Sequence, residues 1–584
     1  MIPSHAPFSP DQTSSLSALL SGFTPDQTMW LSGYLAGLSG SQAGGGGSAS
    51  LTVLYGTESG NSEALADQTV KAAKKKGWKA SMKNLADLKP SDLQQFEQLA
   101  LIVSTWGDGD PPEAIEGFYE AFLKEEVDLQ GVRFAVCALG DSSYEQFCET
   151  GKVFDARLEA LGAERITERQ DCDVDYEESY QTWVDRVFDK LGSSAGLASD
   201  VAAVLSTPSV EYGKKNPFLA EVLESVVLNG EGSAKETLHL ELSLDESGLT
   251  YEVGDALAVL PVNAENVVRE LLAVTGFSGD EEVEIKGGGS LSLGVALRHH
   301  LDITALSRAI ARKYAALAGH AELDRLLSDE ATSEFREWIH GRQIVDLLEA
   351  FPAEGLTAGQ FVGILRKLPP RLYSIASSLK AHPGEVHLTV AAVRYHTHGR
   401  DRKGVASTFL ADDAPVGSKV AVYVHRNNNF RLPADDGAPV IMVGPGTGIA
   451  PFRAFVEERA ERGASGQSWL FFGDQRYSYD FLYQLEWQEH LKEGHLTRLD
   501  VAFSRDQPEK VYVQDVMRQR ASDLWQWLKE GACFYVCGDA ERMAKDVHET
   551  LIGIVAQEGH LSREEAVAFV DQLKKEKRYQ RDVY

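Results

Sequence analysis

The segment Arg371-Leu372-Tyr373-Ser374 places a cation, an aromatic ring and a hydroxyl within consecutive reach on an expected strand. A guanidinium can pair with a pyrophosphate in fork geometry, an aromatic ring can stack on a flavin, and a hydroxyl can hydrogen-bond the flavin nitrogen that receives hydride. These are the needs of a flavin adenine dinucleotide (FAD) site, although an ordinary barrel strand explains the segment equally well. The run Gly404-Val405-Ala406-Ser407 then opens a helix, and its small residues let backbone amides approach a pyrophosphate. This second anion site favours FAD.

A phosphate loop follows the apolar strand expected at 51–55. Its residues are Thr57, Glu58, Ser59, Gly60, Asn61 and Ser62. Hydroxyls, small residues and the N-terminus of a following helix make an anion cradle, because free backbone amides point at the ligand. The loop has no lysine, unlike loops that hold nucleoside triphosphates, so a single phosphate monoester fits better. A plain strand–helix turn is the alternative for this loop taken alone.

Two further strands end in loops that each carry one large aromatic residue. The first loop comprises Ser104, Thr105, Trp106 and Gly107, and the second comprises Leu139, Gly140, Asp141, Ser142, Ser143 and Tyr144. Both loops should flank the phosphate loop, so Trp106 and Tyr144 can sandwich a planar ring. Core packing is the commoner role for a lone aromatic residue, but three loops in consistent positions favour flavin mononucleotide (FMN).

A glycine-rich turn, which includes Gly446 and Thr447, lies between a strand expected at 440–443 and a helix with Pro451 near its first turn. Such a turn alone is weak evidence for a dinucleotide. A later loop adds two cations and three polar groups, which are Ser504, Arg505, Lys510, Tyr512 and Gln514. Cations suit a ribose 2′-phosphate, whereas an acidic residue would bind a free 2′-hydroxyl. The loop therefore favours NADPH over NADH, with a solvated basic loop as the alternative.

Two residues near the end of the chain are candidates for the nicotinamide and flavin faces. Cys537 ends the last expected strand and could face a nicotinamide, although a buried strand cysteine is commoner. The terminal Tyr584 could cover a flavin face, although a terminal aromatic residue usually packs or frays.

Composition narrows the class of protein. The chain has 584 residues and a net charge of −30, from 57 basic and 87 acidic residues. This charge repels nucleic acid and anionic membranes and suits basic protein partners, although simple solubility explains it as well. Five scattered cysteines argue against a disulfide framework, and Cys533 with Cys537 alone make a poor zinc site, so no metal is expected. With no signal peptide and no membrane-spanning run, a cytoplasmic protein is expected.

The elements that must position these residues define several domains. Strand–loop–helix repetition predicts a doubly wound parallel sheet at 50–191. Strands around a helical insertion at about 264–350 predict a β-barrel at 216–436, with a single strand at 387–395. An α/β pattern returns at 437–584. A linker is expected at 192–215, and residues 1–49 contain a short helix, too small to fold alone, and a Gly-Gly-Gly-Gly-Ser run.

These motifs, in this order, resemble the diflavin reductase family, in which a flavodoxin-like FMN domain is fused to a ferredoxin–NADP reductase-like FAD and NADPH module. The resemblance covers residues 51–584. Within the family the chain is most similar to the flavoprotein subunits of NADPH-dependent sulfite reductases. That closer likeness is carried by Asn429-Phe430-Arg431-Leu432-Pro433, by the C-terminal run 577–584 and by the segment 30–38.

The resemblance implies roles for further residues. It adds Glu145, Gln146, Phe147 and Cys148 to the FMN site, and Thr389, Val390, Ala391 and Tyr395 to the FAD site. It adds Val511, Val513 and Asp546 to the NADPH site. It implies that Ser374, Cys537 and Asp582 take part in hydride transfer, and that Tyr584 stacks on the FAD ring and moves to admit nicotinamide.

The resemblance also implies a relay from NADPH to FAD, then to FMN, and finally to a sirohaem iron–sulfur hemoprotein that reduces sulfite to sulfide. It implies self-association through the N-terminal segment. The linker can let the FMN domain move between FAD and the acceptor. Two alternatives remain: a soluble NADPH reductase for another acceptor, such as a cytochrome P450, and a flavin-binding interaction subunit without turnover.

Overall fold

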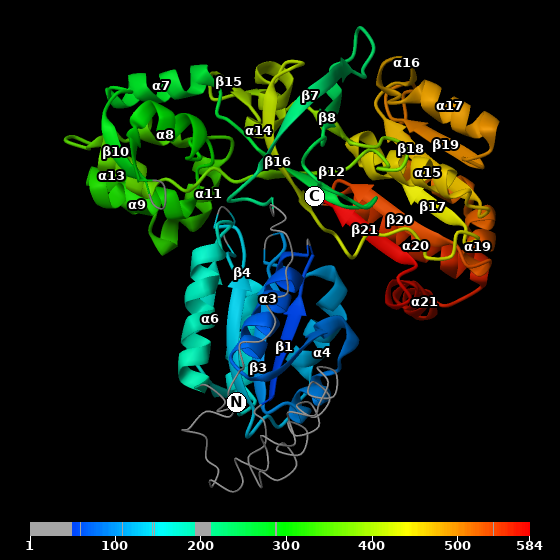
Figure 1. The fold of residues 1–584 in the computed structure, drawn as a ribbon, viewed down its shortest axis with the longest axis horizontal. Coiled ribbons are helices and arrows are strands. Elements are labelled where there is room, and N and C mark those ends of the chain that lie inside the picture. The colour runs from blue at the N-terminus through cyan, green and yellow to red at the C-terminus, as the bar shows by residue number, and fades with distance from the viewer. Residues whose placement is uncertain are drawn as a thin grey trace, which may run out of the picture.

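A computed structural model describes residues 50–58, 60–107, 109–142, 144, 146–192, 212–285, 289–540 and 542–584. Three units are visible in Figure 1: a flavodoxin-like sheet, a barrel with a helical insertion, and a C-terminal α/β unit. This is the architecture expected from the sequence. Among the helices in these ranges, none is long and apolar enough to cross a membrane.

The flavodoxin-like unit is a parallel sheet with strand order β2-β1-β3-β4-β5, and β6 also pairs with β4. Its strands are β1 (Ser50–Gly56), β2 (Lys79–Asn84), β3 (Gln98–Ser104), β4 (Arg133–Leu139), β5 (Glu164–Arg165) and β6 (Gln170–Cys172). Its helices are α3 (Asn61–Lys75), α4 (Glu116–Lys124), α5 (Glu149–Ala160) and α6 (Glu177–Leu191). Since the strands are parallel, the loops after β1, β3 and β4 meet at one edge of the sheet.

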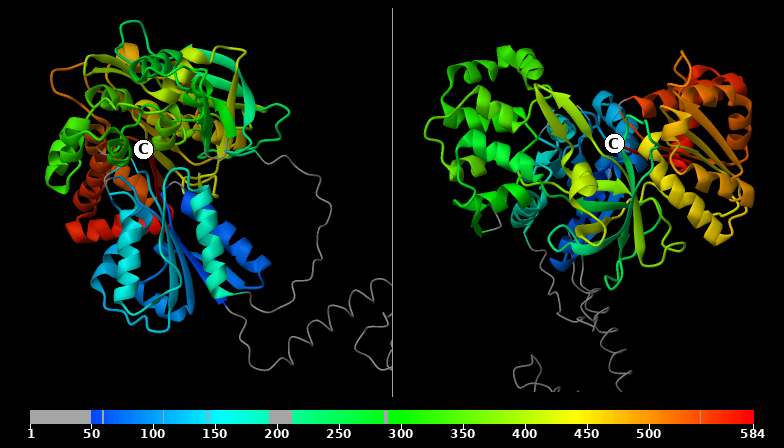
Figure 2. Two further views of the ribbon diagram at one scale, coloured as in Figure 1. Left: turned by 90° about the vertical axis from the view of Figure 1, so that its left-hand side faces the viewer. Right: turned by 90° about the horizontal axis from the view of Figure 1, so that it is seen from above.

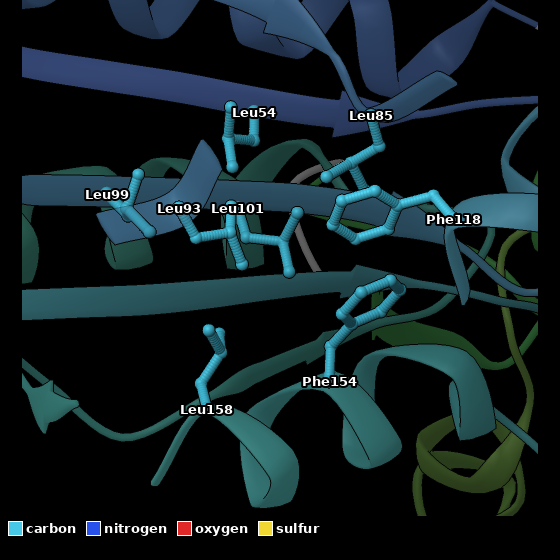
Figure 3. Close-up of a pocket in the computed structure, with 8 residues that line it drawn as sticks. All are labelled: Leu54, Leu85, Leu93, Leu99, Leu101, Phe118, Phe154 and Leu158. Atoms are coloured by element: carbon cyan, nitrogen blue, oxygen red, sulfur yellow. The ribbon is translucent and has the colours of Figure 1, made fainter. Parts of the chain in front are cut away.

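Both faces of this sheet are buried, which explains why its strands are almost continuously apolar. One of the two cores surrounds a small cavity lined by eight apolar side chains, shown in Figure 3: Leu54, Leu85, Leu93, Leu99, Leu101, Phe118, Phe154 and Leu158. No polar side chain lines this cavity, so it has no group to orient a cofactor, and it belongs to the core.

The central unit is an antiparallel sheet with strand order β12-β9-β16-β7-β8-β13. The strands are β7 (Phe218–Val227), β8 (Thr237–Ser243), β9 (Ala256–Leu260), β12 (Arg371–Ser374), β13 (Glu385–Ala391) and β16 (Lys419–His425). A bridge between Ile375 and Leu388 joins the two ends of this order, so the sheet closes into the expected barrel.

Two details differ from expectation. The single strand expected at 387–395 is wrong, because β13 ends at Ala391 and a separate hairpin follows, formed by β14 (Arg394–Thr397) and β15 (Arg400–Lys403). The insertion is not purely helical, because β10 (Glu282–Ile285) pairs with β11 (Gly289–Ser292). Its helices are α7 (Glu265–Thr275), α8 (Leu293–His299), α9 (Arg308–Ala318), α10 (Ala321–Leu326), α11 (Thr332–Ile339), α12 (Ile344–Ala350) and α13 (Ala358–Ile364). Strands of four residues are too short for their pattern to stand out from the neighbouring elements.

The C-terminal unit is a parallel sheet with strand order β19-β18-β17-β20-β21. Its strands are β17 (Val440–Val443), β18 (Ser468–Asp474), β19 (Arg498–Phe503), β20 (Cys533–Gly538) and β21 (Tyr579–Val583). The larger helices are α15 (Ala450–Arg462), α17 (Gln484–Glu493), α18 (Val513–Gln519), α19 (Ala521–Lys529), α20 (Met543–Gly559) and α21 (Arg563–Lys575). The final strand β21 was not expected, and it decides the geometry of the catalytic site.

Candidate active site

The phosphate loop is shaped by a hydroxyl and a glycine. The Gly60 amide donates to Thr57 Oγ1 at 2.9 Å, and Gly60 takes a φ of 85°, a left-handed conformation that favours glycine. Helix α3 begins at the next residue, Asn61, so the first amides of the helix face the loop. Ser59 lies outside the described residues.

Two buried hydroxyls near this loop test whether FMN fits. The Oγ atoms of Ser62, in the first turn of α3, and of Ser104, at the end of β3, are buried and have no hydrogen-bond partner among the described residues. Buried polar groups without partners are rare in folded proteins. A phosphate and a flavin ring would supply the missing partners, so the residues present fit FMN.

The aromatic loops are held by backbone and side-chain bonds. The Trp106 amide donates to Asp110 O at 2.8 Å, and the Ser142 amide donates to Asp173 Oδ1 at 3.0 Å. Trp106 is partly buried, whereas Tyr144 is 52% exposed. The two rings are therefore anchored differently, and Tyr144 is the one open to solvent. Ser143 and Glu145 lie outside the described residues.

The FAD motif lies on the edge strand β12, which pairs antiparallel with β9. Arg371 and Leu372 are exposed, and Tyr373 and Ser374 are partly buried. Burial raises the pKa of Tyr373 to about 12, so its phenol stays neutral and its ring can stack on a flavin.

The second FAD segment begins at Gly404, where α14 (Val405–Thr408) starts. A Cβ at Gly404 would lie 2.8 Å from Ser407 Oγ and 2.9 Å from Val393 Cβ, closer than such atoms approach. The Gly404 amide donates to Val393 O at 2.9 Å, and the Val393 amide donates to Ser407 Oγ at 3.1 Å. This compact turn leads directly into α14, whose first backbone amides have no partner within the helix, so the segment fits a FAD pyrophosphate.

Ser374, Cys537 and Asp582 meet at one carboxylate oxygen. Ser374 Oγ donates to Asp582 Oδ2 at 2.7 Å, and Cys537 Sγ lies 3.9 Å from the same atom. Burial and the nearby Asp582 carboxylate raise the pKa of Cys537 well above its usual range, so the thiol stays protonated. Burial also raises the pKa of Asp582. The structure thus brings together all three residues predicted for hydride transfer.

Asn427 was not predicted, and it completes this cluster. Its side-chain Nδ2 donates to Asp582 Oδ1 at 3.4 Å, and its backbone amide donates to Asp255 Oδ1 at 3.0 Å. Asn427 therefore hydrogen-bonds the carboxylate oxygen of Asp582 that Ser374 does not contact. Its position in a loop between β16 and β17 carries no periodic signal, so only contact across units reveals it.

The terminal Tyr584 is fixed at the edge of the C-terminal sheet. Its hydroxyl lies 2.9 Å from Thr447 Oγ1 in the glycine-rich turn, and its amide donates to Gly538 O at 3.1 Å. Its side chain is 51% exposed. One hydroxyl contact thus holds the terminal ring beside Gly446 and Thr447.

The predicted 2′-phosphate residues gather after β19. Arg505, Lys510 and Tyr512 are exposed, and Gln514 Nε2 donates to Asp546 Oδ2 at 3.2 Å. Two exposed cations in an acidic chain fit an anionic group. Several predicted cofactor-binding residues bury apolar or thiol side chains in the protein, so we expect them to offer a ligand only their backbone; these are Leu139, Cys148, Val390, Ala406 and Val513. Thr389 is also buried, with Oγ1 2.7 Å from the Tyr483 hydroxyl.

Comparison with known families agrees with the three units. The Flavodoxin family matches residues 53–183, the FAD binding domain matches residues 211–409, and the Oxidoreductase NAD-binding domain matches residues 442–549.

Three similar full-length proteins are each a sulfite reductase [NADPH] flavoprotein alpha-component. The Bacillus subtilis protein is 48% identical over 542 residues, covering 92% of this chain and 89% of the relative. The Vibrio cholerae protein is 45% identical over 574 residues (97% and 93%), and the Serratia proteamaculans protein is 43% identical over 592 residues (99% and 98%).

Proposed function

Because the chain belongs to the family of sulfite reductase [NADPH] flavoprotein alpha-components, we propose that it passes electrons from NADPH to a sirohaem iron–sulfur subunit that reduces sulfite to sulfide. The chain is a flavoprotein oxidoreductase with FMN, FAD and NADP domains. When bound, the flavins would supply the chemistry of the relay, which is hydride acceptance from NADPH followed by single-electron transfer toward the acceptor. The observation that supports this function best is the Ser374–Asp582–Cys537 cluster where the barrel meets the C-terminal sheet.

The side chains contribute position and proton control. Arg371 and the Gly404 turn would hold the FAD pyrophosphate, and Tyr373 would support the flavin ring. Ser374 and Cys537 share one oxygen of Asp582, so a proton at this oxygen can be held beside the nicotinamide site. Tyr584 would cover the flavin face until nicotinamide displaces it, which requires loss of the Thr447 contact.

The identity of the acceptor is tested by NADPH oxidation in the presence of sulfite. We expect turnover to sulfide only when a sirohaem iron–sulfur subunit is added to the flavin-loaded chain. Rapid turnover with a cytochrome P450 and none with the sirohaem subunit would support the runner-up function. Failure of NADPH to bleach the flavin absorbance would instead support a binding subunit without turnover.

Arg505→Ala tests the choice of NADPH over NADH. We expect the KM for NADPH to rise about 10- to 100-fold, because a charge-assisted hydrogen bond contributes about 1.5–3 kcal/mol. The KM for NADH should stay within about twofold, since NADH lacks the 2′-phosphate. The matched control is Arg563→Ala on α21, another exposed arginine of the same unit. An equal rise in KM for both nucleotides would contradict a 2′-phosphate site.

Residues 1–49 lie outside the described residues, and self-association through them is a further proposal. We expect deletion of residues 1–42 to lower the native mass, measured by light scattering, to that of one subunit. The truncated chain should still bleach its flavins with NADPH, because residues 50–584 contain all three cofactor units. An unchanged native mass would place the self-association surface elsewhere.

A further inference from the structure

The flavodoxin-like unit lies directly against the other two units, as the two views in Figure 2 show. Its Glu113 begins η3 (Glu113–Ile115), just after the Trp106 loop. One carboxylate oxygen of Glu113 lies 2.9 Å from Lys574 Nζ of α21, and the other pairs with the Arg581 guanidinium of β21. Only 18% of the Glu113 side chain is exposed, so this double ion pair is shielded from water and salt.

A second ion pair joins the units on the other side of the FMN edge. Asp141, in the loop after β4, lies 2.8 Å from Arg366 Nη1. Arg366 is itself held by Asp302 of the insertion at 3.0 Å. The Tyr144 loop and the segment just after the Trp106 loop therefore each form an ion pair with the reductase module, which is the barrel with its insertion and the C-terminal unit.

Glu58 belongs to the phosphate loop and contacts the backbone of Glu113. Its Oε2 accepts the Glu113 amide at 2.8 Å. The charged groups that face it from the adjoining elements are the carboxylates of Glu113 and Asp582 and the guanidinium of Arg581. Glu58 is thus a partly buried carboxyl at a contact between units, with two further carboxylates beside it and one cation.

We propose that Glu113 and Glu58 are positioning residues for electron transfer between the flavins, which hold the FMN unit on the module in a pose that a negative charge on Glu58 weakens. This inference rests on the proposed function, because it assigns the pose in which FAD serves FMN. Glu113 supplies the attraction through Lys574 and Arg581. Glu58 supplies the dependence on pH, since an ionised carboxylate at this contact would be poorly solvated and repelled by its neighbours.

The direction of the pH dependence follows from the two states of Glu58. Burial, with repulsion from Glu113, raises the pKa of Glu58 to about 7 in the docked pose. In the separated pose the C-terminal unit no longer covers Glu58, so its pKa falls toward that of an exposed glutamate, about 4.3, although Glu113 of the same unit stays beside it. Docking therefore takes up a proton, is favoured below pH 7 and weakens as pH rises through 7, by about tenfold between pH 6 and pH 8.

The other titratable side chains at this contact in the described part of the chain include His548, Tyr579 and Asp582. Burial followed by the Lys574 charge lowers the pKa of His548 to about 4, and burial raises the pKa of Tyr579 above its usual range, so both are neutral at pH 6 and pH 8. Burial also raises the pKa of Asp582, so the Glu58→Gln variant is needed to assign a change over this interval to Glu58.

Small-angle X-ray scattering of the flavin-loaded full chain, at pH 6 and pH 8, tests the proposal. We expect the radius of gyration to increase at pH 8, as the docking constant falls about tenfold. Glu58→Gln, a neutral isostere of the protonated residue, should stay compact at both pH values. Glu113→Gln should be expanded at both pH values. Combining Lys574→Gln with Glu113→Gln should increase the radius of gyration little further, because the two residues share one interaction.

Glu549→Gln is the matched control. Glu549 of α20 pairs with Arg563 of α21 at 2.7 Å, but both side chains are exposed and the pair lies within the C-terminal unit rather than between units. This variant should behave as the parent chain does. Anaerobic stopped-flow with NADPH, on the same samples, separates FAD reduction from the later FMN reduction. The rate of FMN reduction should be lower in the samples whose radius of gyration is larger.

The outcomes that would overturn the positioning role differ from the outcome that would overturn the proposed function. If NADPH reduces FAD at normal rates while the parent chain and Glu58→Gln show the same radius of gyration at both pH values, the positioning role is wrong. An unchanged radius in Glu113→Gln would also exclude it. If NADPH does not reduce FAD at all, the proposed function fails, whatever the scattering shows.

Discussion

The Asp582→Asn variant is expected to reduce its FAD with NADPH about 100-fold more slowly than the parent chain, in the range observed for loss of a positioned acid or base. Asp582 Oδ2 is the shared partner of Ser374 Oγ and Cys537 Sγ. An amide keeps the shape of the carboxyl, but it can neither carry the negative charge nor exchange the proton. The loss should therefore appear in the first, FAD-reducing phase of anaerobic stopped-flow.

The pH dependence of that phase distinguishes a proton role from a structural one. Burial raises the pKa of Asp582 above the value of an exposed aspartate, about 3.9. Its protonated form therefore persists to higher pH than usual and disappears as pH rises through the raised value. The parent chain should show this titration in the FAD-reducing phase, and Asp582→Asn should not.

Asn427→Ala provides a graded comparison, because it removes the bond to Asp582 Oδ1 but leaves the carboxylate in place; it also removes the bond that Asn427 Oδ1 accepts from the Asn429 amide. A loss of about fivefold is expected, which corresponds to one neutral hydrogen bond of about 1 kcal/mol. FAD content, measured after release from each variant, should equal that of the parent chain. If Asp582→Asn reduced FAD at the parent rate, the carboxylate would have no part in hydride transfer.

Gly448→Ala should abolish most NADPH-driven reduction for a different reason. A Cβ on Gly448 would lie 2.1 Å from Cys537 O and 2.7 Å from Cys537 C. Both are backbone atoms of β20, which is hydrogen-bonded to β17 and β21, so they cannot rotate away as a flexible side chain could. The glycine-rich turn and the strand that carries Cys537 must therefore move apart.

Two measurements record the consequence. The free energy of unfolding should fall by about 1–3 kcal/mol, as for other overpacked sites. A displacement of about 1 Å at the reacting centre costs about 100-fold in rate, so FAD reduction by NADPH should fall by that factor. FMN content should be unchanged, because the FMN unit is separate from this turn.

Gly553→Ala is the matched control for this substitution. Gly553 lies on α20 of the same unit, and a Cβ there meets no atom within 4 Å among the described residues. Alanine also favours the helix by about 1 kcal/mol over glycine, so this variant should be at least as stable as the parent chain. Normal reduction rates in Gly448→Ala would show that the turn tolerates a side chain and that its close approach to β20 is unimportant.

Much of the fold was predictable because its signals are local. The FMN loops and the glycine-rich turn are short runs directly after apolar strands, and parallel sheets place such loops at one edge. The strands expected at 133–139 and 419–425 match β4 and β16, since continuous apolar or alternating residues mark them. The hairpin β10–β11 was missed because each of its strands has only four residues, too few for the alternation in β10 to stand out within a helical segment.

The sequence by itself determined the three cofactor units, their order and the residues of each loop, because contiguous residues make each motif. Only the tertiary structure decided which motifs meet. The parallel pairing of β20 with β21 places Asp582 opposite Cys537, and the closed barrel brings Ser374 to both. Contacts between units, such as Glu113 with Lys574, join residues more than 400 positions apart. No local pattern encodes such a pair, because it depends on how separately folded surfaces pack.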